Sequence, residues 1–313
     1  MPNPVLSVIV ATRDRPDDIA RCMDALALQT LGKQLEIVVV DDGSTTDIEA
    51  IVRDHVAGDA TVRYVRQEGS GAAKARDHGT AIASADLLAY LDDDAVPEPA
   101  WAEAVISAFR EWDCDGVAGR IRLRLMSPAP DWLHGRDWLA LSEFEMGPKP
   151  LRLHGRDLPY SANCAVTRRY FERVGGFSAA VVSRMDHTLS TAEDTWFFEQ
   201  VREMGGSIVY VPDACVEHVV NPQRLTTDWF IQRAMAQGAS TALLRLGRDR
   251  SRLSQPALLV REIMRLVLRL PAELARDTVL RRKTIGTRLF LAYERGALFA
   301  LLKRRAPTAR KSL

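Results

Sequence analysis

Three apolar segments limit the folds open to this chain of 313 residues, and they cover residues 6–11, 35–40 and 87–91. Each is a near-continuous run of apolar, mostly branched side chains, which is typical of parallel strands buried on both faces of a sheet. Helical patterns separate them at residues 16–28 and 72–84. Strands that alternate with helices predict a doubly wound α/β fold, in which ligands bind at the carboxyl ends of the strands.

Polar residues follow all three strands, at the edge of the sheet where a ligand is expected. They are residues 12–14, residues 41–44 and the run Asp92-Asp93-Asp94. Adjacent carboxylates repel one another unless a cation neutralises them, and Mg²⁺ and Mn²⁺ are the hard cations that take oxygen ligands. We therefore expect Asp92 and Asp94 to serve a divalent cation, and Asp93 to point to the other side.

The charge of the chain is divided unevenly along its length, although the net charge is only +1. Residues 1–232 carry 23 Lys and Arg against 36 Asp and Glu, a net of −13, whereas residues 233–313 carry 19 against 5, a net of +14. The acidic part argues against a nucleic-acid enzyme. The basic part suits an anionic membrane surface, an anionic partner or the acidic part of the same chain.

The location of the protein is predicted from what the chain contains and lacks. Its four cysteines are scattered without a C-x-x-C pair, which is typical of free thiols in a reducing compartment. The first residues lack the basic and apolar regions of a signal peptide, and no apolar run is long enough to predict a spanning helix. We expect a cytoplasmic protein that the basic part can bring to the inner face of the membrane.

Residues 226–313 are predicted to form a basic helical extension. Arg261, Arg265 and Arg269 recur at a spacing that places them on one side of a helix. A basic amphipathic helix is typical of a membrane-surface element, so one interpretation is peripheral membrane contact through residues 233–313. The other is a helical appendage whose Arg residues are solvated or paired with the acidic part of the chain.

Seven short motifs then follow one another in a recognisable order over about residues 5–220. They are V-I-V-A-T-R-D-R-P at 8–16, V-V-V-D-D-G-S at 38–44, G-A-A-K-A-R-D-H-G at 71–79, L-D-D-D at 91–94, V-G-G-F at 174–177, E-D at 193–194 and V-E-H at 216–218. In this order the motifs resemble those of the family 2 glycosyltransferases, which are inverting sugar transferases of the GT-A fold.

The resemblance implies an α/β architecture of the GT-A type, a Rossmann-like, mostly parallel mixed sheet flanked by helices. It implies a catalytic domain over residues 1–225, with a nucleotide-binding half at 1–118 and an acceptor-binding half at 119–225. The basic extension would follow at residues 226–313. The implied reaction moves a sugar from a nucleotide-diphosphate donor to an acceptor hydroxyl by a single displacement.

The resemblance also implies which residues bind the donor. Asp42 would accept a hydrogen bond from the base of the nucleotide, with Thr12 and Arg13 at its border. Arg76 would pair with the phosphates, a role that suits a fixed guanidinium fork. Asp92 would approach the ribose or a metal-bound water. An alternative for Asp42 is a local turn into Gly43, as is common for Asp before Gly.

For the metal and the chemistry, the resemblance implies that Asp94 ligates Mg²⁺ or Mn²⁺ and that His218 supplies a further ligand. Asp194 would be the general base that removes the acceptor proton, and a neighbouring Glu193 would raise its pKa. The alternative for Glu193 and Asp194 is an ordinary helix N-terminus, where acidic residues are favoured. Spacing does not decide which of these two carboxylates is the base.

Two other classes stay open at this stage: a sugar-phosphate nucleotidyltransferase and a non-catalytic nucleotide-sugar binding or scaffold protein. The chain carries no residue-level code for the donor sugar or the nucleotide. The acceptor, a glycan, a lipid-linked molecule or a natural product, is equally open, as is the oligomeric state. Nucleic acid is not expected as a partner.

Overall fold

The computed structural model describes residues 4–55, 60–178, 193–248, 255–279 and 285–303. The chain divides into two compact units. The first, called the sheet unit, comprises Met1–Met126, Leu141–Arg184 and Glu193–Asn221, and the second, called the helical unit, comprises Ser127–Ala140, Met185–Ala192 and Pro222–Leu313. The division into residues 1–225 and 226–313 stays a prediction.

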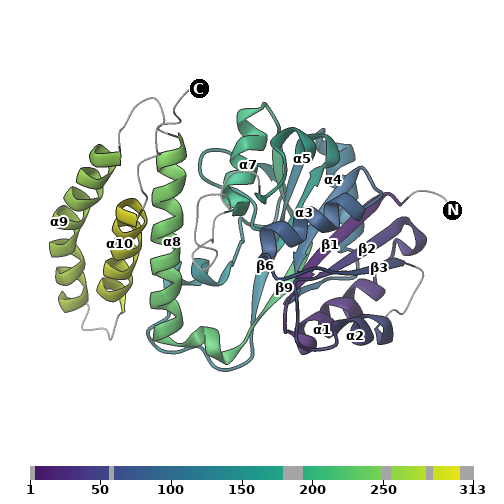
Figure 1. Cartoon of the computed structure of the whole chain (residues 1–313), viewed down its shortest axis with the longest axis horizontal. Helices are drawn as coiled ribbons and strands as arrows, with labels where there is room; N and C mark the ends of the chain where they lie inside the picture. The colour runs from purple at the N-terminus through teal and green to yellow at the C-terminus, as the bar shows by residue number, and fades with distance from the viewer. Residues whose placement is uncertain (1–3, 56–59, 179–192, 249–254, 280–284, 304–313) are drawn as a thin grey trace, which may run out of the picture. The chain divides into compact units, whose positions relative to one another are not determined.

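Four parallel strands build one half of the sheet. They are β1 (Leu6–Thr12), β2 (Leu35–Asp41), β3 (Thr61–Arg66) and β4 (Leu87–Asp92), in the order β3-β2-β1-β4. The helices between them are α1 (Pro16–Ala27), α2 (Ile48–Asp54) and α3 (Ala72–Ile82). Helices α1 and α2 lie on one face of the sheet and α3 on the other (Figure 1). The chain thus changes face between β1 and β4, a switch point at which doubly wound sheets bind ligands.

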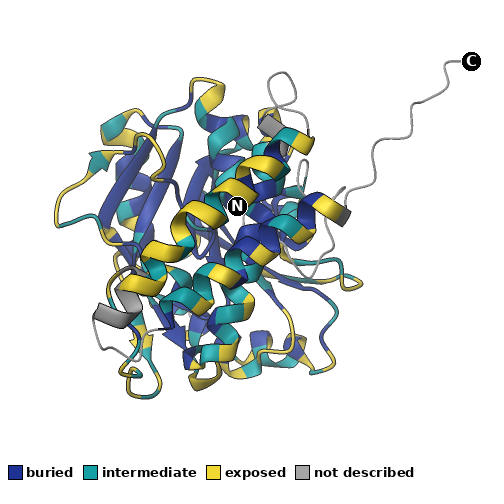
Figure 2. Cartoon of the chain, turned by 90° about the vertical axis from the view of Figure 1, so that its left-hand side faces the viewer, coloured by how far each residue is buried: buried dark blue, intermediate teal, exposed yellow. Residues whose placement is uncertain are grey.

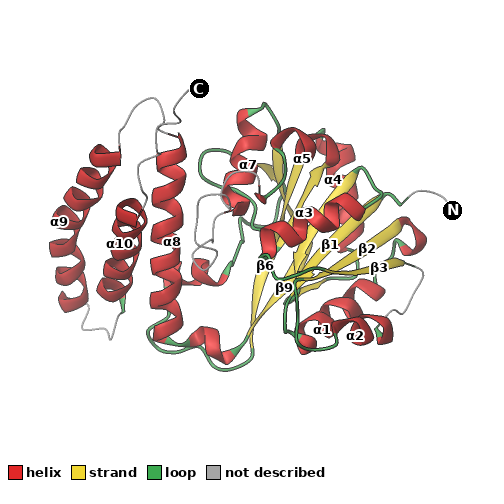
Figure 3. Cartoon of the chain, in the orientation of Figure 1, coloured by secondary structure: helices red, strands yellow, loops and turns green. Residues whose placement is uncertain are grey.

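The other half of the sheet is mixed (Figure 3). Its strands are β5 (Ala95–Pro97), β6 (Gly116–Leu125), β7 (Leu151–Arg152), β8 (Asn163–Thr167) and β9 (Ile208–Val220). Strand β8 runs antiparallel between β4 and β6, β6 is parallel to β9, and β5 and β7 are antiparallel to β9. The remaining helical segments of the described sheet unit and its connections are η1 (Gly32–Gln34), α4 (Trp101–Trp112), η2 (Gly135–Leu141), α5 (Arg168–Val174) and α7 (Glu193–Glu203).

Helix α3 packs closely on the sheet through Gly79. A Cβ atom at this position would lie 2.6 Å from Cγ2 of Ile9 and 2.9 Å from Cγ2 of Val40, so any larger residue would push the helix away. The strands beneath it are fully buried, as their continuous apolar sequence predicts. Arg76 lies three residues before Gly79, on the same side of the helix, and the close packing therefore holds Arg76 near the strand ends.

The described part of the helical unit contains η4 (Pro222–Leu225), α8 (Thr227–Arg248), α9 (Gln255–Val279) and α10 (Gly286–Lys303) (Figure 1). A Cβ atom at Gly238 of α8 would lie 1.9 Å from the carbonyl oxygen of Tyr293, and one at Gly296 of α10 would lie 1.9 Å from that of Met235. Glycine at both positions lets the two backbones touch. The predicted C-terminal helical extension is confirmed, and no helix among the described residues is long and apolar enough to cross a membrane.

A group of charges, called the helical cluster, joins two buried glutamates to two partly buried arginines of this unit and consists of Arg245, Glu262, Arg265 and Glu294. Arg265 lies 3.1 Å from Glu262 and 2.8 Å from Glu294, and Arg245 lies 2.9 Å from Glu262. Of the arginines that the sequence placed on one side of α9, Arg265 thus pairs within its own unit.

Candidate active site

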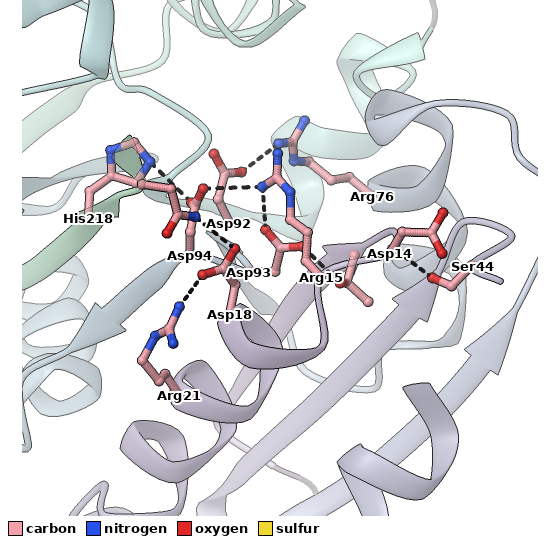
Figure 4. A network of polar contacts seen from close by, with 12 residues as sticks. Asp14, Arg15, Asp18, Arg21, Ser44, Arg76, Asp92, Asp93, Asp94 and His218 are labelled. Carbon is pink, nitrogen blue, oxygen red and sulfur yellow. Dashed lines mark hydrogen bonds and ion pairs between the residues drawn. The ribbon is translucent and has the colours of Figure 1, made fainter. Parts of the chain in front are cut away.

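The register of two distant strands brings Asp94 and His218 together. Strand β4 ends at Asp92, and a two-residue turn leads into β5, where Ala95 pairs with His218 of β9. The carbonyl oxygen of Asp94 accepts a hydrogen bond of 2.8 Å from the backbone N–H of Val219. Both side chains are buried, and Asp94 Oδ1 lies 3.1 Å from Nε2 of His218. Figure 4 shows these groups at the end of the strand.

The hydrogen bonds of His218 test whether this pair fits a divalent cation. Its Nδ1 lies 2.8 Å from the carbonyl oxygen of Leu141, and because a carbonyl only accepts, Nδ1 carries the hydrogen. In the neutral ring, Nε2 then turns a lone pair toward the carboxylate of Asp94. Two lone-pair donors facing each other favour a cation, and adjacent ligands of an octahedral Mg²⁺ lie about 3 Å apart.

The pair fits such a cation only with help from other ligands. Among the described residues, no three His, Cys, Asp or Glu side chains form a group that holds a metal ion. This is compatible with Mg²⁺, which usually takes one or two carboxylates and completes its shell with water and substrate phosphates. Asp94 and His218 therefore fit the metal role predicted for them, without demonstrating it.

Asp93 and Arg15 lie in the same group of charges. Arg15 Nη1 donates to Asp93 at 2.7 Å and to Asp94 at 3.1 Å, and Thr12 Oγ1 donates to Asp93 at 2.8 Å. Burial, reinforced by Asp94 and opposed by Arg15, raises the pKa of Asp93 to about 7. The expectation that Asp93 points to the other side is therefore wrong, because β4 ends at Asp92 and the turn ends the alternation of side chains.

Arg76 links the end of β4 to the start of α7. It is buried, and it lies 2.7 Å from Asp92 through Nη2 and 3.4 Å from Glu193 through Nη1. Burial disfavours its charge, but Asp92 and Glu193 outweigh this effect and raise the pKa of Arg76 further. The guanidinium group is thus already neutralised by protein carboxylates, and the predicted contact with donor phosphates stays a prediction.

Asp194 lies in the first turn of α7, buried among hydrogen-bond donors. Its Oδ2 accepts from the backbone N–H of Ser161 at 3.0 Å and its Oδ1 from that of Thr195 at 2.7 Å. Burial and the charge of Glu193 raise its pKa to about 6, although both hydrogen bonds and Arg76 act against the shift. A carboxylate with this pKa is ionised at neutral pH and basic enough to accept a proton.

Asp42 and Arg13, two of the residues predicted to lie at the base of the nucleotide, contact the loop between β3 and α3. Asp42 accepts hydrogen bonds from Gln67 Nε2 at 2.7 Å and from the backbone N–H groups of Ser70, at 2.7 Å, and Gly71, at 2.8 Å. Arg13 is exposed, and a Cβ atom at Gly69 would lie 2.9 Å from its Nη1. Asp42 therefore ties β2 to the loop before α3, a long-range structural role that differs from the local-turn alternative, since it is Asp41 that accepts from the nearby backbone N–H of Ser44.

These contacts define a group of charges that we call the strand-end cluster. It consists of Arg15, Arg76, Asp92, Asp93, Asp94, Glu193, Asp194 and His218. Its members come from the ends of β4 and β9 and the starts of α1, α3 and α7. The sequence predictions missed Arg15, and the signal was its position: it lies three residues after the end of β1 and directly before Pro16, at the same sheet edge as Asp92.

Two glycosyltransferases resemble this chain over about three quarters of its length. The chain is 24% identical over 250 residues to a glucosyl-dolichyl phosphate glucuronosyltransferase of Haloferax volcanii, covering 77% of each chain. It is 26% identical over 241 residues to a pre-mycofactocin glycosyltransferase of Mycobacterium tuberculosis, covering 76% of this chain and 47% of that protein.

The fold is similar to that of a mannosyltransferase from Pyrobaculum calidifontis, whose structure was solved with GDP-Man and Mn²⁺. The TM-score is 0.60 at 20% identity, and the match covers 96% of this chain and 88% of the other. The predicted GT-A architecture is confirmed. Residues 7–175, more than half of the chain, match the model of glycosyl transferase family 2. This chain belongs to glycosyl transferase family 2.

Proposed function

We propose that the protein is an inverting glycosyltransferase that uses a divalent cation and Asp194 as general base. Family membership supports sugar transfer and argues against the two other classes considered from the sequence, a nucleotidyltransferase and a non-catalytic binding protein. The observation that carries the finer proposal is the strand-end cluster, in which Arg76 joins the carboxylates of the β4 end to those at the start of α7. Arg76 thus links Asp92, two residues before the proposed metal ligand Asp94, to Glu193, the residue next to the candidate base.

In this proposal the donor is a nucleotide-diphosphate sugar, the class that the Pyrobaculum calidifontis neighbour binds as GDP-Man. Asp42, with Thr12 and Arg13, would lie at the base of the nucleotide, and Asp92 and Arg76 at the ribose and phosphates. Asp94 and His218 would hold the cation. When bound, a divalent cation neutralises charge that develops on a leaving diphosphate.

The proton of the acceptor hydroxyl would pass to Asp194. Oδ1 of Asp194 accepts from the backbone N–H and the hydroxyl of Thr195, while Oδ2 accepts one backbone hydrogen bond and keeps a second lone pair, so the group is oriented and Oδ2 can still accept a proton. As the hydroxyl attacks the anomeric carbon from the face opposite the diphosphate, the configuration inverts. The acceptor would be a glycan, a lipid-linked molecule or a natural product, and we propose that the reaction takes place in the cytoplasm.

Calorimetric titration with nucleoside diphosphates, with and without Mn²⁺, tests the donor site, and a hydrolysis screen across nucleotide sugars identifies the donor. We expect Mn²⁺-dependent binding, and Asp194→Asn should keep this binding while turnover falls by roughly a thousandfold. Asp157→Asn, an exposed carboxylate in the same half of the domain, is the matched control. Full turnover in Asp194→Asn would refute the base, and the absence of any nucleotide binding would refute the donor site.

A further inference from the structure

Helix α9 of the helical unit carries large apolar side chains on its solvent-facing side. Figure 2 shows exposed residues along this helix. The exposed fractions are 59% for Val260, 44% for Ile263, 50% for Met264, 60% for Val267, 69% for Leu268 and 51% for Leu274. We call these six residues the α9 apolar face. Their spacing of three or four residues puts them on one side of the helix, over about 21 Å of its length.

The opposite side of α9 is charged and turned inward. Glu262 is almost completely buried, and its partners Arg245 and Arg265 lie within 3.1 Å of it. Arg265 also reaches Glu294 of α10 at 2.8 Å and stacks 4.9 Å from the ring of Tyr293. Rotating α9 to bury its apolar side would break these buried ion pairs. The helical cluster therefore fixes the orientation in which the α9 apolar face is exposed.

The positive charge of this part of the chain indicates which kind of partner can cover the α9 apolar face. Residues 233–313 have a net charge of +14, and two of their five acidic residues are the buried Glu262 and Glu294. Arg261 is exposed and lies seven residues before Leu268, so it borders the α9 apolar face, whereas exposed Arg269 lies on the opposite side of the helix. A second copy that met this face through its own α9 would bring another segment of net charge +14 and repel, whereas an anionic lipid surface brings the opposite charge.

We propose that the α9 apolar face docks on an anionic lipid bilayer, with its side chains in the interfacial region and Arg261, at its border, at the lipid headgroups. A surface helix of this kind lies in the plane of the membrane. Docking does not depend on the proposed function. Its consequence does: an enzyme held in this way would meet an acceptor that is itself linked to a lipid.

Vesicle flotation of the full chain tests the proposal, with phosphatidylcholine vesicles compared with vesicles that also contain phosphatidylglycerol. We expect binding to the anionic vesicles that weakens as salt is added. The double variant Val267→Glu/Leu268→Glu should lower the bound fraction by roughly tenfold. The matched control is Leu28→Glu, because Leu28 is 70% exposed in the sheet unit and Leu268 is 69% exposed in α9.

Thermal unfolding and size-exclusion chromatography of the same variants give the remaining outcomes. Unchanged melting of the double variant, together with lost flotation, supports docking. Three results would overturn it: no flotation of the wild type, equal flotation of the double variant, or flotation lost equally in Leu28→Glu. A wild-type dimer that the double variant dissociates, without vesicle binding, would assign the face to a second copy. A lower melting temperature without vesicle binding would assign it to contact within the chain.

Discussion

Two clusters of charge, one in each unit, are built alike around buried carboxylates but differ in their balance of positive and negative groups. Each contains an arginine between two carboxylates, Arg15 in the strand-end cluster and Arg265 in the helical cluster. In the helical cluster, two carboxylates are matched by two arginines at 3.1 Å or less, and a third, Arg261, lies 3.6 Å from Glu262, so negative charge is not in excess. In the strand-end cluster, five carboxyl groups share two arginines and one histidine.

The difference has a chemical consequence. Burial and crowding raise the pKa of Asp93 to about 7 and that of Asp194 to about 6, so the strand-end cluster holds protons or attracts cations near neutral pH. A balanced group gains little from a further cation and instead fixes how its helices pack. We therefore expect excess negative charge to mark the site of chemistry, and charge without this excess to mark a structural contact.

The largest expected effect comes from removing the central carboxylate of the unbalanced cluster. Asp94→Asn should weaken Mn²⁺-dependent binding of a nucleoside diphosphate by roughly a hundredfold or more, because an amide brings no negative charge to the cation. Calorimetric titration measures it. Asp213→Asn, an exposed position on β9, is the control. Unchanged Mn²⁺ dependence in Asp94→Asn would mean that the excess charge serves no cation.

In the balanced cluster, the same kind of change should act on stability alone. Arg265→Met leaves Glu262 and Glu294 without their shared partner, and we expect the free energy of unfolding to fall by about 3 kcal/mol. Denaturant unfolding measures this, and Mn²⁺-dependent nucleotide binding should not change. Arg261→Met is the control, because Arg261 is half-exposed and lies 3.6 Å from Glu262. Equal losses in both variants would contradict a structural role for the buried pairs.

Sequence patterns predict local structure well, but they do not predict which distant residues come into contact in these clusters. The apolar runs predict β1, β2 and β4 because continuous burial on both faces leaves a local signature. The contact of Asp94 with His218 has no local signature, since it depends on the pairing of β5 with β9, and only the family resemblance indicated it. Arg15 was missed because its partners lie across the sheet.

The predictions for α9 fell short for the same reason. The spacing of its arginines correctly places them on one side of the helix, but spacing does not tell which side faces the protein. Glu262 and Glu294, far apart in sequence, draw Arg265 inward and leave apolar side chains outside. Asp93 was assigned wrongly because strand alternation was extended past the residue at which β4 ends.

A smaller effect should come from removing the negative charge next to Asp194, the proposed general base. Glu193→Gln removes a negative charge beside Asp194, so the pKa of Asp194 should fall below about 6. Because a base must be deprotonated to act, kcat/KM of the wild type should decline below about pH 6, and in the variant this decline should begin at a pH lower by up to about one unit. Glu203→Gln, at the exposed far end of α7, should keep the wild-type profile.

The smallest effect is expected from changing Arg15, which lies between two carboxylates as Arg265 does in the helical cluster. If Arg15 partly supplies the positive charge that the strand-end cluster needs, it competes with a divalent cation for Asp94. Arg15→Gln should then tighten Mn²⁺ binding by about fivefold and lower the melting temperature in the absence of metal, because Asp93 and Asp94 lose their partner.

Mn²⁺ titration followed by electron paramagnetic resonance measures the affinity directly, without turnover. Arg21→Gln on the same helix is the control, since Arg21 pairs with Asp18 instead. Weaker Mn²⁺ binding in Arg15→Gln would reverse the argument. Arg15 would then orient Asp94 as Arg265 orients its glutamates, and the excess charge of the strand-end cluster would have to be met by the cation and the donor together.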